Sequence, residues 1–215
     1  METFNNVKQP SLASLKAGFP LKGKWNKDFF KNDAPIVLEL GCGMGEYTVG
    51  LAEKFPNKNF LGIDVKGARM WQGASIALDK KLNNVGFLRI SIEWIEECFS
   101  DNEVSEVWIT FPDPQIKKRR SSKRLTHTSF LKKYSTILEN DGVLHLKTDS
   151  EFLYGFTLGV ISAEHHRLLD ATNDLYLSQQ KRDHMEIKTH YEQKFLELGK
   201  PITYIQFKLN DSKNC

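Results

Sequence analysis

The stretch Ile36-Val37-Leu38-Glu39-Leu40-Gly41-Cys42-Gly43-Met44-Gly45 decides the fold of this 215-residue chain. Its first five residues are apolar except for one carboxylate, which predicts a short buried strand, and glycine then occupies every second position. Residues 45–55 have helical spacing, because Tyr47, Leu51 and Phe55 recur four residues apart. A strand, a glycine turn and a helix in this order are typical of α/β proteins that bind a ligand at the carboxyl ends of parallel strands.

Strand and helix patterns alternate along the rest of the chain. Further strands are predicted at 59–63, 85–90, 104–111, 143–148, 168–171 and 202–209, and helices at 67–80, 92–99, 151–164 and 189–198, with one more from Thr128 or Ser129 to a stop at Asp141-Gly142. This alternation predicts a doubly wound α/β fold with a mostly parallel, seven-stranded sheet covered by helices on both faces. The direction of the last strand is left open.

The repeating pattern fills residues 35–210, which we predict to be one domain, as expected for a chain of this length. Residues 1–34 are polar and irregular and are interpreted as an N-terminal arm, and residues 211–215 as a polar tail. The chain start lacks the features of a signal peptide, and no apolar run approaches the roughly 18 residues of a membrane span. We therefore expect a cytoplasmic protein without membrane contact.

The cysteines give no sign of a disulfide framework or a metal site. Cys42, Cys98 and Cys215 are far apart and odd in number, which predicts reduced thiols. No Cys or His spacing matches that of a zinc site. We therefore expect no bound metal.

The glycine turn carries the first candidate site. Gly41, Gly43 and Gly45 are spaced Gly-x-Gly-x-Gly, unlike the Gly-x-Gly-x-x-Gly of pyrophosphate cradles. Glu39 would repel a pyrophosphate and suits an amine-bearing ligand, while Asp64, at the end of the next strand, occupies a position where an acid commonly binds ribose hydroxyls. An amine and a ribose without phosphate describe S-adenosylmethionine (SAM). The alternative is a plain strand-to-helix turn with an Asp cap.

A second candidate site follows the strand that ends at Phe111. The strand runs into Pro112-Asp113-Pro114, and six cations follow within eight residues: Lys117, Lys118, Arg119, Arg120, Lys123 and Arg124. The chain has a formal net charge of only +3, so its remaining residues sum to −3 and the positive field is concentrated here. A concentrated basic segment in mid-domain favours a polyanionic substrate over a sorting tag. The alternative interpretation is that Asp113 is a simple turn residue, since Asp-Pro is common in turns.

Together these motifs resemble the tRNA (guanine-N7)-methyltransferase family, of the bacterial type by length, over roughly residues 35–209. The specific mark is Pro-Asp-Pro followed by a basic run that ends in Arg-Leu, here residues 112–125. Residues 39–45, 62–64, 146–149 and 189–192 match its other signatures in order. The resemblance implies the Rossmann-like fold of class I methyltransferases, SAM as methyl donor, tRNA as substrate, and methyl transfer to N7 of a guanine in the tRNA variable loop.

The resemblance also implies roles for individual residues. It implies donor contacts from Glu39, Gly41, Gly43, Gly45, Asp64, Ser91 and Asp113, a catalytic role for Asp113, and substrate contacts from Lys117, Asp149, Thr189, His190, Tyr191 and Glu192. We predict phosphate contacts from Lys118, Arg119, Arg120, Lys123 and Arg124. Two residues depart from the family pattern, since Gln115 stands in place of the usual Trp and Ser91 in place of the usual Asp.

Several alternatives remain open at this point. Residues 189–192 also read as a capping box at a helix start, with Tyr191 in the core, and residues 149–150 as a helix cap. A methyltransferase acting on another RNA base or on a small molecule is the main rival function, and an RNA-binding module with an inactive donor site is a second. We expect no obligate protein partner, and a monomer or weak homodimer.

Overall fold

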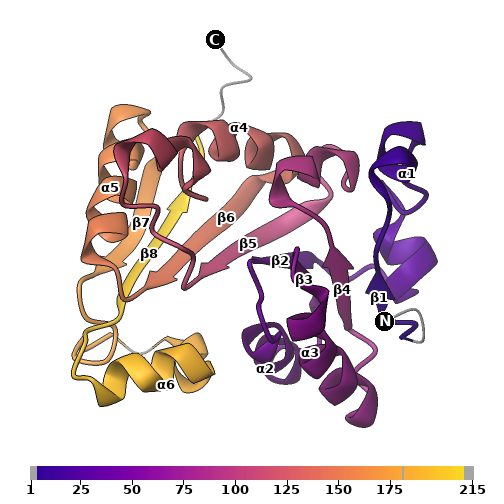
Figure 1. Cartoon of the computed structure of the whole chain (residues 1–215), viewed down its shortest axis with the longest axis horizontal. Coiled ribbons are helices and arrows are strands. Elements are labelled where there is room, and N and C mark those ends of the chain that lie inside the picture. Colours follow the sequence, from indigo (N-terminus) through magenta and orange to yellow (C-terminus); the bar gives the residue numbers. More distant parts are fainter. Residues whose placement is uncertain (1–3, 181, 211–215) are drawn as a thin grey trace.

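The computed structural model describes residues 4–180 and 182–210. It has one eight-stranded sheet, with strand order β1-β4-β3-β2-β5-β6-β8-β7 (Figure 1). The strands are β1 (Val7–Lys8), β2 (Ile36–Leu40), β3 (Asn59–Asp64), β4 (Val85–Arg89), β5 (Val104–Thr110), β6 (Leu138–Thr148), β7 (Arg167–Thr172) and β8 (Thr203–Lys208). The predicted α/β class with a mostly parallel sheet is confirmed, and the predicted count of seven strands is wrong.

The helices alternate with the strands along the chain. The α-helices are α1 (Leu12–Ala17), α2 (Glu46–Lys54), α3 (Gly67–Asp79), α4 (Thr128–Ile137), α5 (Glu151–Ala163) and α6 (His190–Glu197). The other helical segments are the π-helix η1 (Trp25–Phe30) and the 3₁₀-helices η2 (Ile92–Glu97), η3 (Lys118–Lys123) and η4 (Asp183–Glu186). The helix predicted to stop at Asp141-Gly142 ends earlier, at Ile137, because β6 begins at Leu138 and takes in these residues through a shift in its pairing with β5.

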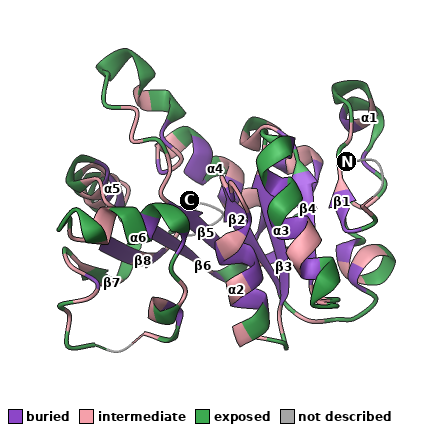
Figure 2. Ribbon diagram, turned by 60° about the horizontal axis from the view of Figure 1, so that its bottom comes forward, coloured by how far each residue is buried: buried purple, intermediate pink, exposed green. Residues whose placement is uncertain are grey.

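Hydrophobic cores lie on both faces of the sheet, because successive side chains of a strand point to opposite faces. In β2, Ile36, Leu38 and Leu40 join the core that includes residues of α1, α4 and α5. Val37 joins the core that includes residues of α2 and α3. Figure 2 shows the buried strands between helices whose outer sides are exposed. This double burial explains why the strand reads as a nearly continuous apolar run.

The N-terminal arm is more ordered than the sequence indicated. Its residues Val7–Lys8 form β1, the additional strand that was not predicted, which pairs parallel to β4. Trp25 is completely buried, stacks on Phe99, and donates its indole N–H to the carbonyl of Cys98 at 2.9 Å. Residues 4–34 are therefore packed into the same body as the rest of the chain. The predicted polar tail, 211–215, lies outside the described residues.

The order of the strands creates the position for a site. Strand β2 pairs with β3 on one side and with β5 on the other, all parallel, so the chain winds in opposite directions from this point. Crevices at such a reversal, beyond the carboxyl ends of the strands, are the usual ligand sites of open α/β sheets. The last strand, β8, is antiparallel to both β6 and β7.

Candidate active site

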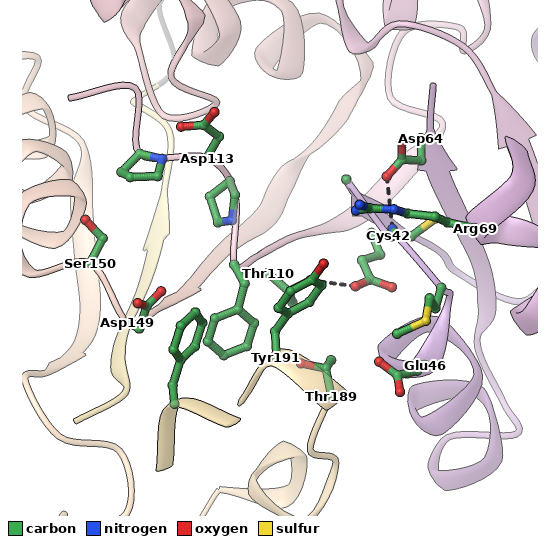
Figure 3. Close-up of a pocket in the computed structure, with 18 of the residues that line it drawn as sticks. Cys42, Glu46, Asp64, Arg69, Thr110, Asp113, Asp149, Ser150, Thr189 and Tyr191 are labelled. Atoms are coloured by element: carbon green, nitrogen blue, oxygen red, sulfur yellow. Dashed lines mark hydrogen bonds between the residues drawn. The ribbon is translucent and has the colours of Figure 1, made fainter. Parts of the chain in front are cut away.

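A cavity of about 580 Å³ opens at this reversal point. Figure 3 shows its lining: Cys42, Asp64 and Arg69 lie on one side, Asp113, Asp149 and Ser150 on the opposite side, and Thr189 and Tyr191 between them. The first group follows β2 and β3, the second follows β5 and β6, and the third comes from the start of α6. The two candidate sites of the sequence therefore face each other across one cavity.

The glycine loop presents bare backbone to the cavity. Gly41, Gly43 and Gly45 have φ angles of 78°, 54° and 74°, a region that favours glycine. A Cβ on Gly41 or Gly43 would meet no protein atom within 4 Å, and both residues line the cavity. Gly45 lies outside the lining, and a Cβ there would meet Phe87 and the backbone of Gly73. Gly41 and Gly43 thus leave room for a ligand, whereas Gly45 allows close packing.

Asp64 lines the cavity and stabilises the loop beside it. Its Oδ2 accepts the amide N–H of Gly43 at 3.0 Å, and its Oδ1 accepts that of Lys66 at 2.8 Å. Asp64 therefore stabilises the glycine turn but does not cap α3, whose N-cap is Lys66 and has no side-chain cap bond. Because Asp64 also lines the cavity, a contact with a ligand remains a prediction. Arg69, in the first turn of α3, lines the same side of the cavity.

Glu39 is buried at the floor of the cavity. Its carboxylate accepts hydrogen bonds from the hydroxyls of Thr48 in α2 and Thr110 in β5, the latter at 2.5 Å. Burial raises the pKa of this carboxyl from 4.5 to about 7, although the two hydroxyls oppose the shift. Glu39 therefore titrates near neutrality, and a cationic ligand group would favour its charged form.

The Pro112-Asp113-Pro114 turn is strained and held in place. The flanking residues Phe111 and Gln115 both have φ of 46°, a conformation that costs about 1–3 kcal/mol for a residue other than glycine. Asp113 Oδ1 accepts the amide N–H of Gln115 at 3.0 Å, as in an Asx turn. Asp113 is itself exposed and lines the cavity. Strain of this kind is typical of functional sites.

Arg124 corrects one of the sequence predictions. Its guanidinium donates to the carbonyls of Pro114 and Gln115 and lies 4.4 Å from the ring centre of Phe156, and the residue is only 5% exposed. It therefore holds the strained turn, and burial keeps it from the phosphate contact predicted for it. The other five cations are exposed: Lys117, Lys118, Arg119, Arg120 and Lys123.

The four residues of the motif at 189–192 have different surroundings at the start of α6. Thr189 is the N-cap and its hydroxyl oxygen accepts the amide N–H of Glu192 at 3.2 Å, as the capping alternative predicted. Tyr191 lines the cavity and is 43% exposed, so it is no core residue. Glu192 is completely buried, which contradicts the predicted substrate contact. His190 is exposed and lies outside the lining.

Asp149 and Ser91 have different placements. Asp149 lines the cavity 3.5 Å from the ammonium of Lys200, while the neighbouring Ser150 is the N-cap of α5. Ser91 is the half-buried N-cap of η2 and lies outside the lining of the cavity. The structure thus brings Asp149 to the other candidate residues and leaves Ser91 apart from them.

Several residues of the site carry no signal in the sequence. Thr48 and Thr110 belong to the site through their hydrogen bonds to Glu39, and Arg69 through its place in the lining. Nothing in their local sequence pattern points to these positions. Within residues 4–180 and 182–210, no group of three or more His, Cys, Asp or Glu side chains is arranged to hold a metal ion. In the same part of the chain, no helix is long and apolar enough to cross a membrane.

Comparisons with known proteins agree with this geometry. A family model described as "Putative methyltransferase" matches residues 33–205. Among solved structures, the 16S rRNA methyltransferase KamB has a TM-score of 0.66 at 12% identity, covering 86% of this chain and 92% of that one. The 16S rRNA (adenine(1408)-N(1))-methyltransferase from Catenulisporales acidiphilia has a TM-score of 0.59 at 13% identity, covering 90% and 93%. The family model and the fold together define a methyltransferase with the class I fold.

Curated relatives are far more similar in sequence. The tRNA (guanine-N(7)-)-methyltransferase of Christiangramia forsetii is 58% identical over 97% of this chain and 94% of its own length. That of Porphyromonas gingivalis is 52% identical over 98% of this chain and 87% of its own length. The chain belongs to the tRNA (guanine-N(7)-)-methyltransferase family.

Proposed function

We propose that the protein transfers the methyl group of SAM to N7 of a guanine in the variable loop of tRNA. The observation that carries this proposal is the shared cavity, where the glycine loop faces the Asp113 turn and the exposed basic segment follows that turn. A donor nucleoside on one side and an RNA strand on the other would meet there.

The residues present fit SAM as the donor. The backbone at Gly41 and Gly43 is open to a ligand, as the free space at their Cβ positions indicates. Asp64 and Glu39 both line the cavity, where Asp64 would accept from the ribose hydroxyls and the carboxylate of Glu39 would bind the amine. When bound, SAM supplies a methyl group on a positively charged sulfur.

Methyl transfer to guanine N7 requires positioning of the reactants rather than a general base. Guanine N7 is an unprotonated acceptor, so its lone pair is already available. Holding the reacting atoms in line supplies much of the rate. An ionised Asp113 is acceptor-only, so it would accept from guanine N–H groups or from the amine of the donor and stabilise the positive charge that develops on the purine. The exposed face of Tyr191 offers a surface on which a base can stack.

Nucleoside mass spectrometry tests the proposal directly. Unmodified tRNA is incubated with the protein and SAM, digested to nucleosides and analysed. We expect 7-methylguanosine, and mapping of the modified strand should place it in the variable loop. A different methylated nucleoside would support the alternative of another RNA base, and an unmethylated product would contradict the proposal.

A proposal on assembly follows from the same geometry, and one on location follows from the proposed tRNA substrate. Because one chain supplies both sides of the cavity, we propose activity without an obligate protein partner, as a monomer or weak homodimer in the cytoplasm. Sedimentation of the purified protein beside an activity assay tests the first point. Activity that appears only after adding a cell extract would contradict it.

The variant Gly43→Ala tests the donor side of the cavity. We expect SAM to bind about fivefold more weakly or worse, because the new Cβ enters the ligand space and the backbone has a positive φ. Calorimetry measures the affinity. The matched control is Gly18→Ala, which has φ of 105° and equally open surroundings but lies outside the cavity lining. Equal losses in both variants would show that backbone strain alone is responsible.

The pKa of Glu39 predicts a pH dependence. Because this pKa is about 7 in the folded protein, SAM binding through the carboxylate should weaken several-fold from pH 7.5 to pH 6 and should release a proton. The unfolding free energy of the ligand-free protein should fall as pH rises from 4.5 through 7, since burial disfavours the charged form. Calorimetry in buffers of different ionisation enthalpy measures the proton release. The variant Glu39→Gln should remove it, and retention of the release would contradict this role.

A further inference from the structure

Lys147 and Glu192 form an ion pair that is sealed from water beside the cavity. Their Nζ and Oε1 atoms are 2.7 Å apart, and both side chains are 0% exposed. The Lys147 ammonium lies 5.0 Å from the ring centre of Tyr47 in α2. The hydroxyl of Tyr176 donates to the same Glu192 oxygen at 2.6 Å. The pair therefore joins β6 to the first turn of α6, next to α2.

Stability alone is a weak reason for such a pair. Desolvation costs several kcal/mol per buried ion, and apolar side chains of similar volume are often equally stabilising or better. Desolvation also lowers the pKa of Lys147, against the attraction of Glu192. The best-attested use of a buried charged or polar group is to select one arrangement of the elements that it joins.

The arrangement selected here is that of the α6 N-terminus. Glu192 is adjacent to Tyr191 and three residues from Thr189, both of which line the cavity. A second anchor lies beside the pair, because Glu46 Oε2 in α2 accepts the amide N–H of His190 at 3.0 Å. A rotation or shift of α6 that breaks the ion pair would move Tyr191 and Thr189 out of the cavity wall.

We propose that Lys147 and Glu192 are positioning residues, which set the register of α6 on the sheet so that Tyr191 and Thr189 face the reacting guanine. Neither side chain lines the cavity. The inference rests on the proposed function, since its kinetic readout is methyl transfer to tRNA.

The test replaces the pair by apolar residues in the double variant Lys147→Met/Glu192→Leu. We expect its melting temperature to stay within a few degrees of that of the parent protein, because no unpaired charge is left buried. We expect kcat for tRNA methylation to fall about 10- to 100-fold with a smaller change in the KM for tRNA, since the basic segment is intact while the cavity wall is misplaced. Hydrogen exchange should quicken in residues 187–197 and stay unchanged in residues 36–54.

Two further variants complete the test. Glu192→Gln leaves Lys147 buried and unpaired, so it should lower the melting temperature and, assayed well below that temperature, lose kcat as the double variant does. The matched control is Glu186→Gln, which breaks the exposed pair with Lys54 just before the same helix and should change neither quantity.

Two outcomes would overturn the inference. One is parent-like kcat in the folded double variant or in Glu192→Gln, and the other is unchanged hydrogen exchange in residues 187–197. If the parent protein itself fails to methylate tRNA, the proposed function fails, and the hydrogen-exchange comparison still decides the positioning role.

Discussion

Asp113→Asn is expected to lower the turnover of tRNA methylation by about 10²–10³, the usual effect of removing one preorganised electrostatic group. The substitution keeps the size of the side chain, and an Asn Oδ1 still accepts the amide N–H of Gln115, so the strained turn persists. What is lost is the negative charge that faces the cavity. Single-turnover kinetics with saturating tRNA and SAM measure the effect.

Asp174→Asn is the matched control for this substitution. Asp174 Oδ1 accepts the amide N–H of Tyr176 at 3.0 Å in the same kind of turn, outside the lining of the cavity. Its variant should keep parent-like turnover. If Asp113→Asn does the same, Asp113 is a turn residue and the catalytic assignment is wrong.

Neutralising the exposed basic segment should weaken tRNA binding without affecting the donor. For Lys118→Gln/Arg119→Gln we expect about 10- to 50-fold weaker binding at low salt, since two charge-assisted phosphate contacts are removed. The slope of log affinity against log salt should fall by roughly 0.7–0.9 for each lost contact. Binding titrations across a salt series measure both, and SAM calorimetry should be unchanged.

Lys80→Gln/Lys81→Gln supplies the control for charge alone. These two exposed lysines follow α3, whose C-terminal end lies toward the opposite edge of the sheet from the cavity. The control should leave the salt slope nearly unchanged. A parallel loss of SAM affinity in the Lys118/Arg119 variant would point to a folding defect, and an unaltered slope would place the phosphates elsewhere.

The order of elements was predictable because each element has a local cause. Apolar runs of strand length, helical spacing and a glycine turn are all visible within ten residues, so β2 and α2 were predicted within a residue of their observed ends. Strand β1 was not predictable, because two residues are too few to show the alternating pattern of a strand. Val7–Lys8 becomes a strand only through its pairing with β4.

The candidate site, too, was predictable from the sequence only in part. The Gly41 turn and the Pro112-Asp113-Pro114 turn were found because both follow predicted strands, and parallel strands bring their carboxyl ends to one edge. Which polar side chains are buried was a different matter. Arg124 looks like its exposed neighbours in the sequence, yet Phe156 and two carbonyls enclose it.

By itself, the sequence determined the class of fold, the cavity edge and the two turns that face each other, because these follow from patterns within short segments. Only the tertiary structure decided that Glu192 binds Lys147, that Gly45 serves packing, and that four residues of the N-terminal arm belong to the core: Leu15, Phe19, Trp25 and Phe30. The physical reason is that burial and pairing depend on residues that are distant along the chain. Whether a charged side chain is exposed to water or paired in the interior is determined only by the packing of the helices and strands around it.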